Sequence, residues 1–339
     1  MKVLRGIYAG AAARLGGLLD STGFQRGKSS ILLRQVDAIS AALGAQSDRW
    51  VTGEMKSKWI ESAKAVDRDI ESIGVKLGGG SAALGADWLR INQGAVGVFA
   101  SQLARDLAGA NAKLASNARR VIAATSQKVI ADPKLSATIA QGLVSGGSIQ
   151  KIGRSVRDQL TAAGQELLDS GKLSQAEASA IIDLKAGVIQ AGGKRMDIGK
   201  YATLVAHYQV RQAVVEATKD RLTEQGEMFG DPDLFDLVTV VGPISGDLCD
   251  FFVGKIFSIS GRSDEFPALG SIPGPPFHPN CTHTIAPFVM RFASGKEIER
   301  GRINEKFLNL NTSTAQSMYR GPDRNFAARA EDKGQAAGE

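Results

Sequence analysis

Apolar residues recur every three or four positions over three long stretches of the first half of the chain, residues 31–43, 47–73 and 87–131. This period predicts amphipathic helices, because such positions share one helix face. Gly44 is expected to end the first helix, and the triple glycine at 78–80 to break the second. Asp132 followed by Pro133 should stop the third stretch, which is read as one long helix or two abutting ones.

Three further helices are predicted before the character of the sequence changes. Ser148 can cap a helix over 149–160, and Ser174 with Glu177 forms a capping box that opens a helix over 176–190. The last helix, over 197–224, has apolar residues on one side. His207 lies inside it without a local acidic partner and is interpreted as an ordinary half-buried residue.

After residue 230 the pattern becomes that of short strands joined by irregular loops. The β-branched run 237–241 predicts a first strand, and 255–259 and 282–285 predict two more. A proline-rich loop, FPALGSIPGPPFHP, joins the second strand to the third. A loop of this length in a compact region usually needs something to hold it.

The expected fold is therefore mainly α, with an elongated multi-helix N-terminal body followed by a small α+β Cys/His module. The predicted divisions are a basic helical region over 1–147, a helical region over 148–235 that leads into the module, the module itself over 236–290, and a short helix with a flexible polar tail over 291–339. Aromatic residues make up only 6% of the chain, which favours thin helical packing over one thick core.

The formal charge of +6 is a modest basic excess that suits a polyanion partner. Residues 101–160 contain nine Lys or Arg and three Asp or Glu, so their exposed side should be the most basic surface. The same charges also serve simply to solubilise helices, and no aromatic residues interleave with them to stack bases. The candidates for phosphate contact are Arg119, Arg120, Lys128, Lys151, Arg154 and Arg157.

Candidate chemistry is concentrated in residues 241–288, which hold both cysteines and two of the three histidines. Cys249 stands between the first two predicted strands, while His278, Cys281 and His283 form H-x-x-C-x-H. Two cysteines and two histidines from two short segments match the ligand set of one tetrahedral zinc ion. Four protein ligands would close the coordination sphere, so such a site would be structural and would contribute folding energy.

Three other interpretations of these residues remain open. Cys249 and Cys281 could form a disulfide, although two cysteines in 339 residues favour a reducing compartment. The cysteines could be small buried hydrophobes beside ordinary hydrogen-bonded histidines. Alternatively, the two histidines could join an acidic residue in an open metal or acid/base site of a nuclease or toxin-like enzyme; the acidic candidates are Asp247, Asp250 and Asp264.

The segments CDFFVGKIF and FHPNCTH, with a proline-containing loop between them, resemble the C-terminal module of tailed-phage minor head proteins, the phage Mu F-like family. Matches to the family pattern C-x-x-C, Gly, aromatic, H-x-x-C-x-C fall on Cys249, Gly254, Phe257, His278 and Cys281. Phe252 replaces the second cysteine of the pattern, and His283 replaces the last one. The resemblance covers roughly residues 148–288, including the helix that leads into the module.

This resemblance implies a minor capsid, or head morphogenesis, protein in the phage head, made in the bacterial host cytoplasm. It implies the portal protein and the major capsid protein as partners, and a role in head assembly and DNA packaging or ejection without catalysis. Packaged DNA is an expected non-specific partner, because each neutralised phosphate adds salt-sensitive affinity. Self-association is a further candidate interaction, and no membrane partner is expected, since no apolar run reaches the roughly 18 residues of a membrane span.

Overall fold

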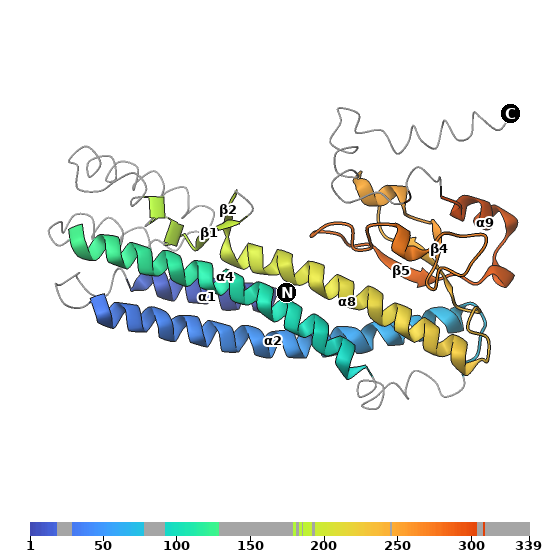
Figure 1. The fold of residues 1–339 in the computed structure, drawn as a ribbon, viewed down its shortest axis with the longest axis horizontal. Coiled ribbons are helices and arrows are strands. Elements are labelled where there is room, and N and C mark those ends of the chain that lie inside the picture. Colours follow the sequence, from blue (N-terminus) through green and yellow to red (C-terminus); the bar gives the residue numbers. More distant parts are fainter. Residues whose placement is uncertain are drawn as a thin grey trace. The chain divides into compact units, whose positions relative to one another are not determined.

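The computed structural model describes residues 1–18, 29–77, 92–128, 179–180, 183–184, 186–191, 194–244, 246–303 and 308 of the chain. The chain divides into two compact units. Unit 1 comprises Met1–Thr52 and Gln102–Ala206, and unit 2 comprises Gly53–Ser101 and His207–Glu339. The fold is mainly helical, with a helical N-terminal body and a small strand-containing region toward the C-terminus, which confirms the predicted fold class (Figure 1).

Four long helices account for most of the described backbone: α1 (Lys2–Gly17), α2 (Ser29–Ser72), α4 (Gln93–Lys128) and α8 (Ile198–Met228). The prediction that Gly44 ends a helix is wrong, because α2, which is 44 residues long, continues through this position. Leu43 and Val51 are both buried on either side of this glycine. Continued burial of the apolar face outweighs the roughly 1 kcal/mol that an interior glycine costs.

Unit 1 is held by contacts among α1, α2, α4 and the start of α8. The Tyr8 hydroxyl donates a hydrogen bond to the Leu107 carbonyl at 3.2 Å, and burial raises the pKa of this phenol. Lys113 of α4 lies over the Tyr201 ring, 5.7 Å from its centre. Arg119 of α4 forms an ion pair with Asp37 of α2.

A two-stranded antiparallel hairpin, β1 (Val188–Ala191) and β2 (Lys194–Asp197), precedes α8. The predicted helix over 176–190 is therefore wrong at its end. Gly187 has a φ of +63°, a left-handed conformation that terminates helices, and its N–H bonds to the Leu184 carbonyl. The β-branched residues that follow then pair as a strand. The predicted helix over 149–160 and the triple glycine lie outside the described residues.

In unit 2, α2 and α8 share a fully buried carboxylate, Asp67. Arg221 donates to its two oxygens from Nε at 2.8 Å and Nη2 at 3.0 Å, and Gln225 Nε2 donates at 3.1 Å. Burial alone would lower the pKa of Arg221, but hydrogen bonds to Asp67 and Glu224 raise it. The cation therefore keeps its charge beside the buried anion.

The strand-containing region is a three-stranded antiparallel sheet of order β4-β3-β5, with β3 (Leu237–Val241) in the centre. Both edge strands are short: β4 spans Ile256–Ser258 and β5 spans Thr284–Pro287. The inward residues Val238 and Val240 are fully buried in one hydrophobic core with Leu222 of α8 and Ile70 of α2. Helices and sheet of unit 2 thus share a core.

Two predicted strands are confirmed, whereas the third begins later than expected. Because β5 starts at Thr284, both Cys281 and His283 precede the strand. The proline-rich loop contains a 3-10 helix, η3 (Leu269–Ser271), and a second one, η4 (Met290–Phe292), follows β5. The last described helix is α9 (Gly295–Gly301), which opens with a capping box between Ser294 and Glu297.

A search of the described helices finds none with the length and apolar character that a membrane crossing requires.

Candidate metal centre

Cys249 is held on a short 3-10 helix, η2 (Leu248–Phe251), in the connection between β3 and β4. Asp247 caps this helix, since its Oδ1 accepts a hydrogen bond from the Cys249 N–H at 2.9 Å. After η2 the chain returns alongside β3 through a bridge between Val253 and Val240, and the Gly254 N–H donates to the Val240 carbonyl at 2.8 Å. The Cys249 side chain is fully buried as a result.

His278 and Cys281 come from the turn that ends the proline-rich loop. The Cys281 N–H donates to the His278 carbonyl at 2.9 Å, which closes this turn. The turn is anchored by Phe277, whose ring stacks on that of Phe252 with centres 4.7 Å apart and planes inclined by 12°. Phe252, the residue that replaces a cysteine of the family pattern, is thus a core residue that joins the Cys249 segment to the His278 segment.

These two segments bring together three of the four predicted ligands. One ligand atom from each of Cys249, His278 and Cys281 lies within 4.8 Å of the other two, and the two sulfurs are 3.5 Å apart. Both cysteines are buried and unlinked, while His278 is partly accessible. Soft sulfur and imidazole donors in such an arrangement could hold a metal ion.

His283, the fourth predicted ligand, lies at the edge of this group. Its Nδ1 is 3.5 Å from Cys281 Sγ, and the ring is only 1% exposed. Its Nε2 is buried and has no hydrogen-bond partner among the residues described. The ring packs so closely on Gly242 that a Cβ there would lie 2.2 Å from His283 Cδ2. Gly242 therefore makes room for this imidazole.

The two thiols differ in acidity because their sulfurs are within hydrogen-bonding distance of each other, 3.5 Å apart. A hydrogen bond from Cys249 lowers the pKa of Cys281 to about 5, against the opposing effect of burial, with further hydrogen bonds from the Phe277 and His283 backbone. The pKa of Cys249 is raised by its hydrogen bond to Cys281, by burial and by the neighbouring negative charge. A thiolate is the form of cysteine that binds metal, so the lowered pKa of Cys281 favours its role as a ligand.

The acidic residues near the Cys/His group differ in what they contact. Asp247 Oδ2 lies 3.2 Å from His278 Nε2. Asp250 accepts a hydrogen bond from the Gly246 N–H at 2.6 Å, which directs its carboxylate to the backbone of the loop. Of the acidic candidates for an open site, Asp247 is therefore the one that the structure brings against a histidine.

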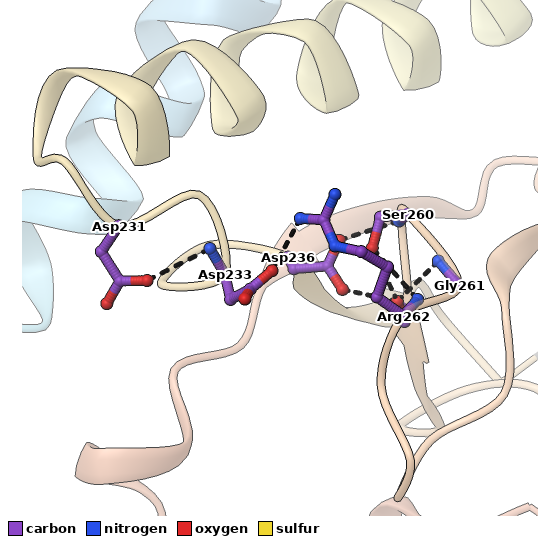
Figure 2. A network of polar contacts seen from close by, with 7 residues as sticks. Asp231, Asp233, Asp236, Ser260, Gly261 and Arg262 are labelled. Carbon is purple, nitrogen blue, oxygen red and sulfur yellow. Dashed lines mark hydrogen bonds and ion pairs between the residues drawn. The ribbon is translucent and has the colours of Figure 1, made fainter.

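A second polar cluster lies where the chain leaves α8 and where β4 ends. Asp236 accepts hydrogen bonds from the Ser258 hydroxyl and from the Ser260 N–H at 2.8 Å, and Arg262 pairs with Asp233 at 2.6 Å (Figure 2). Together with Leu237 and Ser263, three of these residues line an open pocket of about 250 Å³. Because the charged groups satisfy one another, the cluster is interpreted as the support of the turn after β4.

The predicted phosphate contacts are only partly described. Arg119 and Arg120 are exposed on α4, and Arg119 is engaged by Asp37. The backbone of Lys128 lies at the end of α4. Lys151, Arg154 and Arg157 fall outside the described residues.

Comparison of the chain with protein-family models, curated proteins and solved structures finds no match. The class of the protein therefore has to be argued from its own residues, and the best-defined local feature is the buried Cys249, His278 and Cys281 group.

The sequence did not reveal two contributors to this centre. Gly242 is missed because a glycine beside a proline after a strand is typical of a turn, and its contact with His283 bridges 41 positions of sequence. Phe252 appears in the sequence only as a departure from the family pattern. Its stacking on Phe277 depends on tertiary structure, for which the sequence carries only the signal of two large aromatic residues near the cysteines.

Proposed function

We propose that this chain is a structural protein of a tailed-phage head, of the minor capsid or head morphogenesis kind, and that its C-terminal module is clamped by zinc. The support is the convergence of Cys249, His278 and Cys281 in the very segments that resemble the phage Mu F-like family. In this role the protein joins the portal and the major capsid protein and assists head assembly and DNA packaging or ejection.

Distances within the group support zinc as the ion. A tetrahedral zinc ion with Zn–S bonds of about 2.3 Å and Zn–N bonds of about 2.0 Å holds two sulfurs about 3.8 Å apart, and a sulfur and a nitrogen about 3.5 Å apart. The sulfurs of Cys249 and Cys281 are 3.5 Å apart, and His283 Nδ1 is 3.5 Å from Cys281 Sγ. His283 is proposed as the fourth ligand.

A structural role for the ion is supported by the burial of its ligands. Cys249, Cys281 and His283 are 0%, 4% and 1% exposed, so substrate would have little access to the metal. Structural zinc sites are closed by protein ligands, whereas catalytic ones keep a position for water or substrate. Four protein ligands would leave no such position.

The direct test is the protein composition of purified particles of the phage that encodes the chain. After a high-salt wash, quantitative mass spectrometry should find the chain in a few copies for each portal assembly. Its presence in the lysate but absence from the washed particles would contradict the proposal, irrespective of its metal content.

The contact between Asp247 and His278 also supports a second candidate, an acid/base enzyme of the nuclease or toxin-like class. A carboxylate 3.2 Å from an imidazole nitrogen is an arrangement that orients a general base. Nuclease activity of the purified chain that is lost in a His278→Ala variant with unchanged thermal stability would favour this candidate. Lack of cleavage of DNA and RNA by the wild-type chain would remove it.

Non-specific DNA contact through α4 is part of the first proposal. Arg120 and Arg119 should each contribute salt-sensitive affinity, although Arg119 must leave Asp37 to do so. Replacing both with alanine should weaken DNA binding and reduce its dependence on salt. Unchanged binding would remove these two residues from the proposed contact surface.

A further inference from the structure

We infer that Asp247 is a positioning residue of the metal centre, which holds the His278 ring in the orientation required for metal binding. This inference rests on the proposed zinc site and adds a residue that is not itself a proposed ligand. The structural basis is one carboxylate that contacts both ligand-bearing segments, η2 with Cys249 and the turn with His278.

The two oxygens of Asp247 have different tasks. Oδ1 accepts the Cys249 N–H at 2.9 Å, which fixes the start of η2 and hence the place of the Cys249 side chain. Oδ2 lies 3.2 Å from His278 Nε2. This contact has the length of an ion pair but not the alignment of a hydrogen bond, since His278 Nε2 has no hydrogen-bond partner among the described residues. A rotation of the ring that aligns Nε2–H with Oδ2 would hold the tautomer whose Nδ1 is unprotonated and can bind a metal ion.

This arrangement also explains why a partly accessible histidine can be a defined ligand. The His278 side chain is 25% exposed, so packing alone leaves its ring freedom to rotate. A hydrogen bond to the carboxylate, formed when the ring binds metal, would remove that freedom, and such partners of metal-bound histidines commonly contribute about 10- to 100-fold to metal affinity or activity.

An Asp247→Asn variant isolates this role from the capping role. The asparagine oxygen can still accept the Cys249 N–H, whereas its amide nitrogen then faces His278 Nε2–H, donor against donor. Asp250→Asn is the matched control, because it removes an equal charge from the 3-10 helix that Asp247 caps, while its oxygen can still accept the Gly246 N–H.

The experiment measures zinc affinity of the full chain by competition with a chromophoric chelator. Wild type should bind one zinc ion, Asp247→Asn should bind it about 10- to 100-fold more weakly, and Asp250→Asn should retain an affinity close to that of wild type. Equal affinities of the two variants would overturn the inference and leave the zinc site intact. Failure of wild type to bind zinc would overturn the site itself.

A second background separates positioning from a general effect on folding. In the His278→Cys variant the ligand is kept but the imidazole is gone, so adding Asp247→Asn should cause no loss of zinc affinity. A loss as large as in the His278 chain would show that Asp247 acts through η2 or through overall stability, and would overturn the inference.

Discussion

Two of the buried polar clusters described in unit 2, that of Asp67 and the Cys/His centre, differ in whether their groups satisfy one another. Asp67, between α2 and α8, is fully buried and receives three hydrogen bonds from Arg221 and Gln225. In the Cys/His centre, the two sulfurs lie 3.5 Å apart, and the Nε2 atoms of His278 and His283 have no hydrogen-bond partner among the described residues. The helical cluster is complete from protein atoms alone, whereas the Cys/His centre has donor atoms to offer to a cation.

The secondary-structure elements around the two clusters also differ in how much stability they have of their own. α2 and α8 span 44 and 31 residues and satisfy their backbone locally. The strands of the module span only 3 to 5 residues, and the 3-10 helices in its two long connections, η2 and η3, span 4 and 3 residues. Such short strands have little stability of their own. Metal removal is therefore expected to affect the module much more than the helices.

Removal of zinc is the largest expected effect. With a strong chelator, amide hydrogen exchange of residues 249–287 should become faster by several orders of magnitude, because the binding energy of a structural zinc ion is folding energy. The amides of α2 and α8 should keep most of their protection. Equal loss of protection in both regions, or no loss in either, would contradict this difference between the module and the helices.

Asp67→Ala should be the most damaging substitution in the helical part. It leaves the buried Arg221 with only the partly exposed Glu224 as an anionic partner, and the expected loss is about 3 kcal/mol in the free energy of unfolding, measured by urea denaturation. Zinc content should not change. The control is Glu61→Ala, which removes the exposed partner of Lys58 and should cost at most about 1 kcal/mol.

Gly242→Ala tests the close packing around His283 in the module. The new Cβ would lie 2.2 Å from His283 Cδ2, so the imidazole or the strand end must shift. Overpacking of this kind costs about 1–3 kcal/mol, and zinc affinity should fall with it. Gly270→Ala is the control, since a Cβ there meets no atom within 4 Å. Similar stability of the two variants would argue against the close packing of His283.

The smallest expected effect is that of Ser294→Ala. The serine hydroxyl accepts the Glu297 N–H at the start of α9. Loss of such a cap costs about 1 kcal/mol, and Ser294 is not a residue of either cluster. Thermal unfolding should show a small decrease in Tm with unchanged zinc content. A loss of zinc would show that α9 supports the metal centre.

The elements that could be predicted from the sequence are those determined by local pattern. The hydrophobic period of 3.6 residues predicted α8, and the β-branched runs predicted β3 and β4. The errors lie where tertiary packing opposed the local signal: Gly44 remains helical because its neighbours on the helix are buried, and residues 188–191 leave the helical pattern after a glycine with positive φ.

For the centre, the spacing of Cys249, His278 and Cys281 predicted a convergence that the structure contains. Ligation by His283 stays a prediction. The contributions of Gly242 and Phe252 could not be foreseen, because each depends on a contact between segments that are 41 and 25 residues apart in sequence.

The most direct test of the central claim is the zinc content of the full chain, purified without added metal and measured by native mass spectrometry, beside a Cys281→Ser variant. We expect one zinc ion per wild-type chain and none in the variant. A wild-type chain without metal, whether its two thiols are free or oxidised, would contradict the claim.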